Sequence, residues 1–452
     1  MPVAVDDQPN KPTLRRELGL LALIAYGVGY ILGAGIYVLV GKIAGVAGSG
    51  SWVAFAIALG IASLTALSYA ELGGRYPRSG GEAHFCQEAF RSPPVSLLIG
   101  WLVLCSGVVS LATVSRAFAG YLTDLFSVQP TVSVEIILIL LLLALLGGIN
   151  YWGIRQSSRA NIVCTVVEAS GLMLVIIVGL MFLVRGQVAE AQVAAGHNPA
   201  TVGWPSWFAI SQGAALAFFA FIGFEDMVNV AEEVKDPKRN LPRAIMAALV
   251  ISGSVYIVVV WVATFVVPAA ELAVSQAPLL EVVRRAAPKI PPWSFATIAL
   301  FAVANTGLLN FIMASRLLYG MAQQRLLPSW LGKVSATTGT PHLAIATVFT
   351  AALVLAVSGT LVYLAGTTSV LLLLVFAAVN LALVVVKRRN VGEHRGFKAP
   401  VLVPIIGACA SLVLIGFLPR ASLLTATILI ATGFVVVVTQ AIRRRAEAPT
   451  EI

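Results

Sequence analysis

Two adjacent carboxylates, Glu225 and Asp226, stand inside an apolar stretch that is long enough to cross a membrane. They directly follow the aromatic run FFAFIGF at 218–224, and the next basic residue comes ten positions after Glu225. At a rise of about 1.5 Å per residue, Glu225 therefore lies about 15 Å from the basic flank. A charge at that depth costs roughly 2.5–3.5 kcal/mol, which predicts a cavity, a partner or a bound proton. The structural alternative is a pairing on the same helical face with Asn229 or Glu232.

A third carboxylate, Glu168, lies in a different apolar stretch. It follows Arg159 by nine residues, which places it about 13 Å from that end of the stretch. A buried carboxyl at this depth is a candidate for binding a proton or a cation such as sodium. A salt bridge to Arg116 or Arg316, which also lie within apolar stretches, is the structural alternative.

Glycines crowd the first apolar stretch, Leu18 to Val40, which carries no charge. Gly33-Ala34-Gly35 has low helix propensity and little side-chain bulk, so we predict a break in the helix there. Backbone groups freed inside a membrane must line a cavity or meet a ligand. The alternative is close packing of helices through Gly27, Gly29, Gly33 and Gly35.

The composition identifies the kind of molecule that must position these groups. Of the 452 residues, 59% are hydrophobic and 11% are charged, and the mean hydropathy is +0.92. These values indicate an integral membrane protein. The net charge of +10 is spread in short clusters between apolar spans, so we read it as a topology signal and expect no nucleic acid partner.

Twelve spans of roughly 20 residues or longer can be placed along the chain, allowing for tilt. They are 18–40, 51–74, 95–126, 133–151, 158–184, 206–233, 242–268, 293–324, 342–358, 360–388, 400–418 and 421–442. Most of the 30 basic residues then fall on the side that holds both termini, which predicts that this side is cytoplasmic. We also expect short helices on the outer surface at 269–292 and on the inner surface at 80–90.

The sixth span is also predicted to be interrupted, because Gly223 and the carboxylates Glu225 and Asp226 fall within it. The first and the sixth spans each begin a set of five, and a repeat with an odd number of spans has inverted topology. Interrupted helices at matching positions of two inverted repeats are the best sequence pointer to the central site of a transporter. Free N–H groups at a break favour an anion, and free carbonyls favour a cation. Both charges occur together in a zwitterionic amino acid.

Four motifs now carry a resemblance to a known family. They are ILGAGIY at 31–37, SYAELGGRYPRSGG at 68–81, FFAFIGFED at 218–226 running into AEEVKDPKRNLPRAI at 231–245, and MASRLLYGMAQQRLLP at 313–328. The chain resembles the amino acid-polyamine-organocation superfamily, in particular bacterial amino acid permeases close to the cationic amino acid transporters. The resemblance covers the first ten spans and implies a leucine-transporter-like fold, all α, with twelve transmembrane helices, a 5+5 inverted repeat, and helices one and six unwound.

The resemblance also implies roles for individual residues. The substrate carboxylate would meet the amides of Ala34 and Gly35, its amine would meet backbone carbonyls, and Phe219 would cover it as an aromatic gate. The implied binding residues are Ile31, Gly33, Ala34, Gly35, Phe219, Ala220, Ile222 and Phe224. The implied gating and coupling residues are Glu168, Glu225 and Ser315, with Ser315 and the first break expected to lie near Glu168.

Glu168 departs from the family pattern. Many relatives carry a lysine seven residues after an asparagine equivalent to Asn161, and this chain has a glutamate there. The reversed charge favours a proton carrier or a cation ligand, and it weakens any inference that coupling works as in the lysine-bearing relatives.

The sequence therefore predicts a secondary active amino acid transporter of the inner or plasma membrane, working as a proton-coupled symporter or exchanger. A permease for polyamines or other amines is one alternative, and a receptor or channel on the same fold is another. We expect no enzymatic activity, no cofactor and no metal site. The predicted divisions are a cytoplasmic tail at 1–16, repeats at 17–184 and 206–388, two last helices at 400–442, and a cytoplasmic tail at 443–452.

Overall fold

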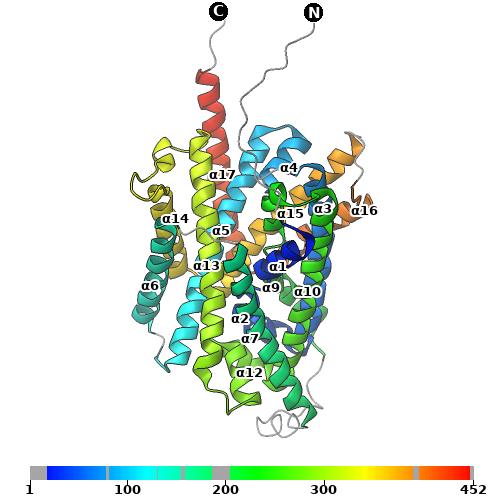
Figure 1. Ribbon diagram of the computed structural model, residues 1–452, viewed down its shortest axis with the longest axis vertical. Coiled ribbons are helices and arrows are strands. Elements are labelled where there is room, and N and C mark those ends of the chain that lie inside the picture. The colour runs from blue at the N-terminus through cyan, green and yellow to red at the C-terminus, as the bar shows by residue number, and fades with distance from the viewer. Residues whose placement is uncertain are drawn as a thin grey trace, which may run out of the picture.

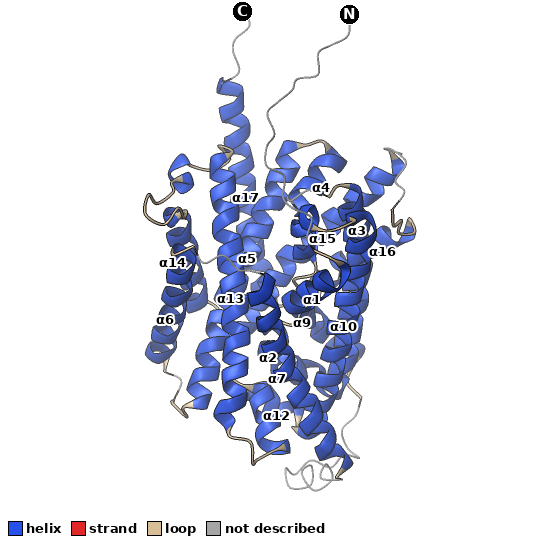
Figure 2. Cartoon of the chain, viewed as in Figure 1, coloured by secondary structure: helices blue, strands red, loops and turns tan. Residues whose placement is uncertain are grey.

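The computed structural model describes residues 18–77, 81–129, 131–153, 158–185, 204–389 and 396–447. Within these ranges the regular elements are helices, and extended pairing is confined to one bridge between Leu18 and Val234 (Figure 2). The predicted all-α membrane protein is thereby confirmed. The predicted tail at 1–16 lies outside the described residues.

In the described part of the chain, nine helical stretches are long and apolar enough to cross a membrane, and three shorter apolar helices, α1, α14 and α16, accompany them. The long helices outside the two breaks are α3 (Ser51–Arg75), α5 (Pro93–Leu125), α6 (Val132–Tyr151), α7 (Ser158–Val184), α10 (Pro237–Val266), α13 (Pro292–Gln323), α15 (Leu361–Arg388) and α17 (Arg420–Glu447). The shorter α14 is His342–Ser358 and α16 is Leu402–Ile415. The helices match the predicted spans in order and place, while the count of twelve and the inverted repeat stay predictions.

The first span is interrupted, as its glycines predict. Helix α1 (Leu20–Ile31) ends where the amide of Leu32 donates to the carbonyl of Val28, and α2 (Ala34–Ala47) begins two residues later. The break is therefore at Leu32 and Gly33, slightly before the predicted centre, and α2 continues well beyond Val40. Glycine at 33 permits the change of direction because it has no side chain to clash with the neighbouring helix.

The sixth span is broken more extensively. Helix α9 (Trp207–Ala217) passes into the 3₁₀ turn η2 (Phe218–Phe221), and the chain resumes as η3 (Glu225–Glu233). Between them Gly223 has φ +127°, a conformation that only glycine adopts without strain. A 3₁₀ segment of nine residues is long for this kind of helix and often marks a functional hinge.

The short surface helices are found with one difference. The inner segment forms α4 (Gly81–Phe90) as predicted. The outer segment forms two helices, α11 (Ala269–Val274) and α12 (Pro278–Ala286), where one was expected, because Pro278 cannot continue a helix from the preceding turn. Helix α17 also extends to Glu447, five residues into the predicted tail.

The broken helices occupy the middle of the bundle, where α1, α2 and α9 meet at mid-height (Figure 1). Helix α3 packs along α10, and α5 packs along α13 and α15, so that long unbroken helices surround the breaks. Leu18 also exchanges two hydrogen bonds with Glu233 and Lys235, of 3.0 and 2.9 Å, which join the start of α1 to the end of η3. The two interrupted spans are thus held to each other and to a common scaffold.

Candidate functional site at the crossing of the two breaks

The two breaks touch each other through backbone. A Cβ atom added at Gly35 would lie 2.5 Å from Cα of Ala220, and one added at Gly223 would lie 2.7 Å from the carbonyl oxygen of Tyr30. Real Cβ atoms do not approach other atoms this closely, so each break needs a glycine where it crosses the other. Close packing and helix interruption, which the sequence left as alternatives, therefore occur at the same residues.

Side chains from the surrounding helices bind the broken ends. The hydroxyl of Tyr256, on α10, donates to the carbonyl of Ile31, and the amide of Ala34 donates to Oγ1 of Thr306, on α13, at 2.9 Å. A Cβ at Gly33 would also meet Oγ1 of Thr306, at 2.5 Å. These contacts satisfy one acceptor and one donor that a helix break leaves without a partner in its own helix. They also occupy two of the backbone groups that the family resemblance assigns to substrate.

The predicted binding residues of the sixth span differ in their surroundings. Phe219 and Ala220 lie in η2, nearly buried, and Phe219 accepts a 3.4 Å hydrogen bond from the amide of Ile222. Ile222 is half-buried at the break itself. Phe224 instead packs its ring against Tyr69 and Phe376, with ring centroids 5.6 and 5.2 Å apart. Its side chain is thus part of the aromatic packing around the break.

Glu225 forms a hydrogen bond to the backbone of the break in the sixth span. Its Oε2 accepts a 2.8 Å hydrogen bond from the amide of Gly223, and its side chain is buried. Asn229 donates to Oδ1 of Asp226 at 3.3 Å, so the pairing with Asn229 that we considered for Glu225 is made by its neighbour. The carboxylate of Glu225 accepts a hydrogen bond from Gly223, the residue with φ +127°. A change in the charge of Glu225 would therefore act directly on the conformation of the break.

Glu168 lies beside the first break, as predicted. Its Oε1 accepts from Nδ2 of Asn305 at 2.9 Å, and its backbone carbonyl accepts from the hydroxyl of Tyr37, on α2, at 2.6 Å. Its side chain is fully buried, and Oε2 has no hydrogen-bond partner within the described residues. A buried, unpaired lone pair on a carboxylate is costly unless a proton or cation binds it.

Neither arginine considered as a partner pairs with Glu168. Nη2 of Arg116 lies 2.9 Å from Oε2 of Glu135, on α6, and Arg316 is exposed and belongs to no ion pair formed by the described residues. The salt bridge to an arginine, which we considered for Glu168, is thus not formed in this structure. What remains are the two alternatives in which the carboxyl binds a proton or a cation.

Ser315 lies away from Glu168. Its hydroxyl accepts from Nδ2 of Asn150 at 3.0 Å and donates to the carbonyl of Ile312, in a buried contact between α6 and α13. The residue of α13 that contacts Glu168 is Asn305. It precedes Ser315 by ten residues, which is about 15 Å along the helix. The structure therefore brings together the first break, Glu168, Asn305 and Thr306, and leaves Ser315 out.

Sequence reasoning missed four side chains that bind the breaks or Glu168. They are Tyr37, Tyr256, Asn305 and Thr306. A signal was present for two of them, because Asn305 and Thr306 are adjacent polar residues in the otherwise apolar stretch 298–309. Buried polar groups in such spans usually have a partner or a function.

Toward the end of the bundle that holds α4 and the two chain ends (Figure 1), another buried carboxylate, Glu82, lies outside the membrane spans. The hydroxyl of Tyr69, on α3, donates to Oε1 of Glu82, on α4, at 3.1 Å. The pKa of Glu82 is raised from 4.5 to about 7, mainly by burial. A backbone hydrogen bond opposes this rise, the negative charge of Asp226 on η3 adds to it, and the hydrogen bond from Tyr69 opposes it. Glu82 therefore takes up a proton near neutral pH.

Protonation of Glu82 should make the protein more stable at low pH. The folded state binds this proton more tightly than the unfolded chain, so stability falls as pH rises from about 4.5 to about 7 and is then flat, with a total change on the order of 3 kcal/mol. In Glu82→Gln this part of the pH dependence of the apparent melting temperature should vanish. Glu88→Gln, at an exposed position of the same helix, is the control and should keep the wild-type profile.

Comparison with known proteins places the chain among transport proteins. A family model described as "Amino acid permease" matches residues 18–441. The branched-chain amino acid permease BcaP of Bacillus subtilis is 28% identical over 89% of this chain and 87% of its own length. The chloroplastic cationic amino acid transporter 9 of Arabidopsis thaliana is 32% identical over 72% of this chain, and the chain spans only 58% of that transporter.

A solved structure shares the fold. The crystal structure of MhsT in complex with L-phenylalanine superposes with a TM-score of 0.63 at 15% identity, over 90% of this chain and all of that one. At this level of identity the similarity concerns the fold alone. The mouse Asc-type amino acid transporter 1 is 29% identical over 95% of this chain and 81% of its own length.

Proposed function

The chain belongs to the amino acid permease family, and we propose that it is a secondary active amino acid transporter that works by alternating access around its two breaks. The observation that carries this proposal is the crossing itself, where Gly35 meets Ala220 and Gly223 meets Tyr30. Two interrupted helices that touch at their breaks create one place where backbone polar groups of both can face a solute. We infer no enzymatic activity, because the relatives named above are transporters and permeases.

The proposed substrate is a zwitterionic α-amino acid. The amino end of α2 begins at Ala34 and offers a partial positive charge to a carboxylate. The carboxyl end of α1 at Ile31, together with the carbonyls of Phe219 and Ile222, offers partial negative charge to an ammonium group. Because Thr306 and Tyr256 already bond Ala34 and Ile31, we propose that the substrate shares or replaces these contacts, with Gly35 as a second amide for the carboxylate.

Glu168 is proposed to couple transport to protons. It contacts Tyr37 of α2 and Asn305 of α13, so it lies where movement of the first span would change its surroundings. Protonation would remove the cost of a buried charge whose Oε2 has no described partner. Glu225 is proposed to act on the other break through its hydrogen bond to Gly223.

The protein crosses the membrane several times, and we propose that it lies in the inner or plasma membrane with both termini in the cytoplasm. The basic residues support this orientation, because most of them belong to the side that holds the termini. The end of the bundle with α4 and the loop after α13 would then face the cytoplasm (Figure 1).

Counterflow in liposomes tests the proposed function. Purified protein is reconstituted, the liposomes are loaded with one unlabelled amino acid at a time, and uptake of the labelled form is followed. Saturable, transient accumulation with at least one amino acid is expected. A protein that accumulates only amines without a carboxylate is a polyamine or amine permease, and one that shows no counterflow with any solute is a receptor or channel.

Phe219→Ala should weaken retention of substrate more than it weakens folding. The ring is proposed to close over the solute, so its removal should speed release and lower affinity, with a smaller loss of melting temperature than Phe218→Ala causes. Phe218→Ala is the matched comparison, because that ring packs against Phe376 with centroids 5.7 Å apart and should mainly stabilise the fold, at about 3–5 kcal/mol. If Phe219→Ala loses stability like Phe218→Ala and releases substrate normally, Phe219 is an ordinary packing residue.

A further inference from the structure

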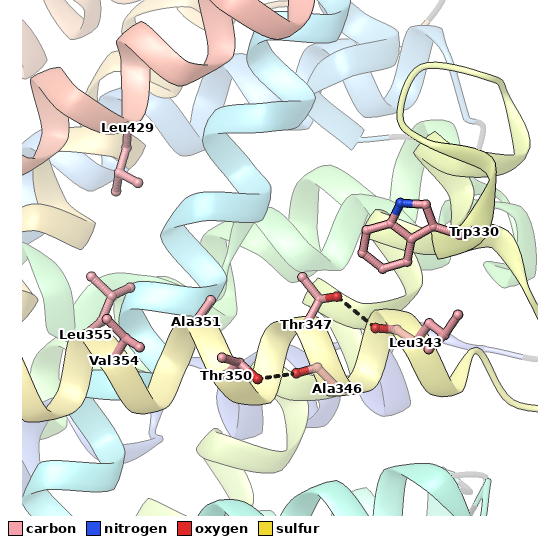
Figure 3. A pocket seen from close by; sticks show the side chains of 9 residues that line it. All are labelled: Trp330, Leu343, Ala346, Thr347, Thr350, Ala351, Val354, Leu355 and Leu429. Carbon is pink, nitrogen blue, oxygen red and sulfur yellow. Dashed lines mark hydrogen bonds between the residues drawn. The ribbon is translucent and has the colours of Figure 1, made fainter.

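A groove with a volume of about 620 Å³ lies on the outside of the bundle, away from the two breaks. Its floor and walls come mainly from α14, with Leu429 of α17 on one side and Trp330 of η4 (Ser329–Gly332) at one end (Figure 3). Helices α14 and α17 both pack against α5, and the groove occupies the space between them. The residues that line this groove have no role in the proposed transport cycle.

The lining is hydrocarbon in character. The threonines at 347 and 350 donate their hydroxyl protons to the carbonyls of Leu343 and Ala346 on the same helix, at 2.8 and 2.9 Å (Figure 3). The remaining α14 residues of the groove are aliphatic, including Val354, which is 60% exposed. A polar solute would find no free hydroxyl donor here, whereas an alkyl chain would cover apolar surface that faces outward.

The dimensions fit one alkyl chain. Leu343 and Leu355 mark the two ends of the groove on α14 and are about 18 Å apart by helical rise, close to the roughly 15 Å thickness of one leaflet of hydrocarbon. A helix of that length and ~10 Å width fills roughly 1,400 Å³. The groove's volume of about 620 Å³ is less than half of that, which favours an alkyl chain over a whole transmembrane helix as its occupant.

The end of the groove at Trp330 has the features of a headgroup site. Trp330 is 47% exposed, and tryptophan is typical of the membrane interface, where its ring is apolar and its N–H is wet. Arg325 and Lys333, on either side of it in sequence, are exposed and take part in no ion pair within the described ranges. Nε2 of Gln440, on α17, donates to the carbonyl of Arg325, which holds this loop across the end of α17 beside the groove.

We propose that this groove binds one acyl chain of an anionic phospholipid, whose headgroup is bound by Arg325 and Lys333. The proposed topology places this end in the cytoplasmic leaflet, where anionic lipids attract basic residues at the membrane surface. Binding would add a connection between α14 and α17, which both pack against α5.

Native mass spectrometry with defined lipids tests this proposal. The protein is exchanged into detergent with equal amounts of phosphatidylglycerol and phosphatidylcholine, and bound lipids are counted. Wild type should retain one phosphatidylglycerol, and Arg325→Gln with Lys333→Gln should lower its preference over phosphatidylcholine roughly 30-fold. Lys398→Gln, at another exposed site on the proposed cytoplasmic side, should leave the preference unchanged.

Filling the groove tests the place of binding. Ala351→Phe should abolish retention of phosphatidylglycerol, and the milder Ala346→Leu, at an exposed position, should weaken it without loss of folding. Leu141→Phe adds bulk to an exposed position of α6 and should retain lipid like wild type. Independently, a phosphatidylglycerol with a photoreactive acyl chain should label peptides from 343–355 in the wild-type protein.

Three results would overturn the proposal. The first is equal retention of phosphatidylglycerol by wild type and both groove-filled variants. The second is equal retention of the two lipids by wild type, which would remove the role of Arg325 and Lys333. The third is a second copy of the chain or another polypeptide that copurifies and is released by Ala346→Leu, which would make the groove a protein interface.

Discussion

Gly35→Val is expected to abolish substrate binding while the protein still folds. The new side chain would begin 2.5 Å from Cα and 3.0 Å from Cβ of Ala220, so the first break could not remain against the second. Overpacking of this kind costs about 1–3 kcal/mol, and because backbone atoms must move, the larger figure applies and affinity should fall ~100-fold or more. Equilibrium binding of a labelled substrate to purified protein measures the effect.

Gly60→Val is the matched control for this experiment. Gly60 lies on α3, is exposed, and has no atom within 4 Å of a Cβ placed on it, so the same substitution should leave binding unchanged. Melting temperatures of both variants show whether the fold survives. Normal binding by Gly35→Val would mean that the crossing is a packing contact alone, and the proposed anion site at the amides of Ala34 and Gly35 would have to be abandoned.

Glu168→Gln is expected to separate substrate exchange from the proton gradient. Glutamine imitates the protonated carboxyl in shape and charge and can keep the contact with Asn305, so exchange should continue. An imposed inward proton gradient should raise uptake by wild-type protein and should have no effect on the variant. Uptake into proteoliposomes, with and without the gradient, measures both properties in one preparation.

Two controls separate coupling from structure. Glu135→Gln changes a half-buried carboxylate that pairs with Arg116, and should leave the response to the gradient intact. Replacing sodium with choline should not affect the wild type, and a loss of uptake would show that Glu168 holds sodium. A Glu168→Gln protein with the wild-type response to protons would disprove the coupling role, and one that only unfolds more easily would indicate a structural role.

The elements of the fold could be predicted because the membrane restricts them strongly. A span must be apolar over about 20 residues, and its backbone must be satisfied within the helix, so composition alone reveals it. For the same reason the breaks were visible: Gly33 and Gly223 stand where a regular helix would otherwise be obligatory, and both lie at interruptions in the structure. The carboxylates Glu168 and Glu225 were recognisable because charge is so unfavourable in these surroundings.

The partners of these groups were decided by tertiary structure. Helix α13 has 32 residues, more than a bilayer requires, so its tilt and its depth relative to α7 cannot be read from its sequence. That offset determines that Asn305, rather than Ser315, reaches Glu168. In the same way, Glu225 bonds Gly223 instead of Asn229 because η3 is wound as a 3₁₀ helix, which moves residues four apart off a common face. The local sequence determines where a helix tends to break and where a buried charge is costly. Contacts between distant spans depend instead on the depth and tilt at which the helices pack, and an apolar pattern does not determine either quantity.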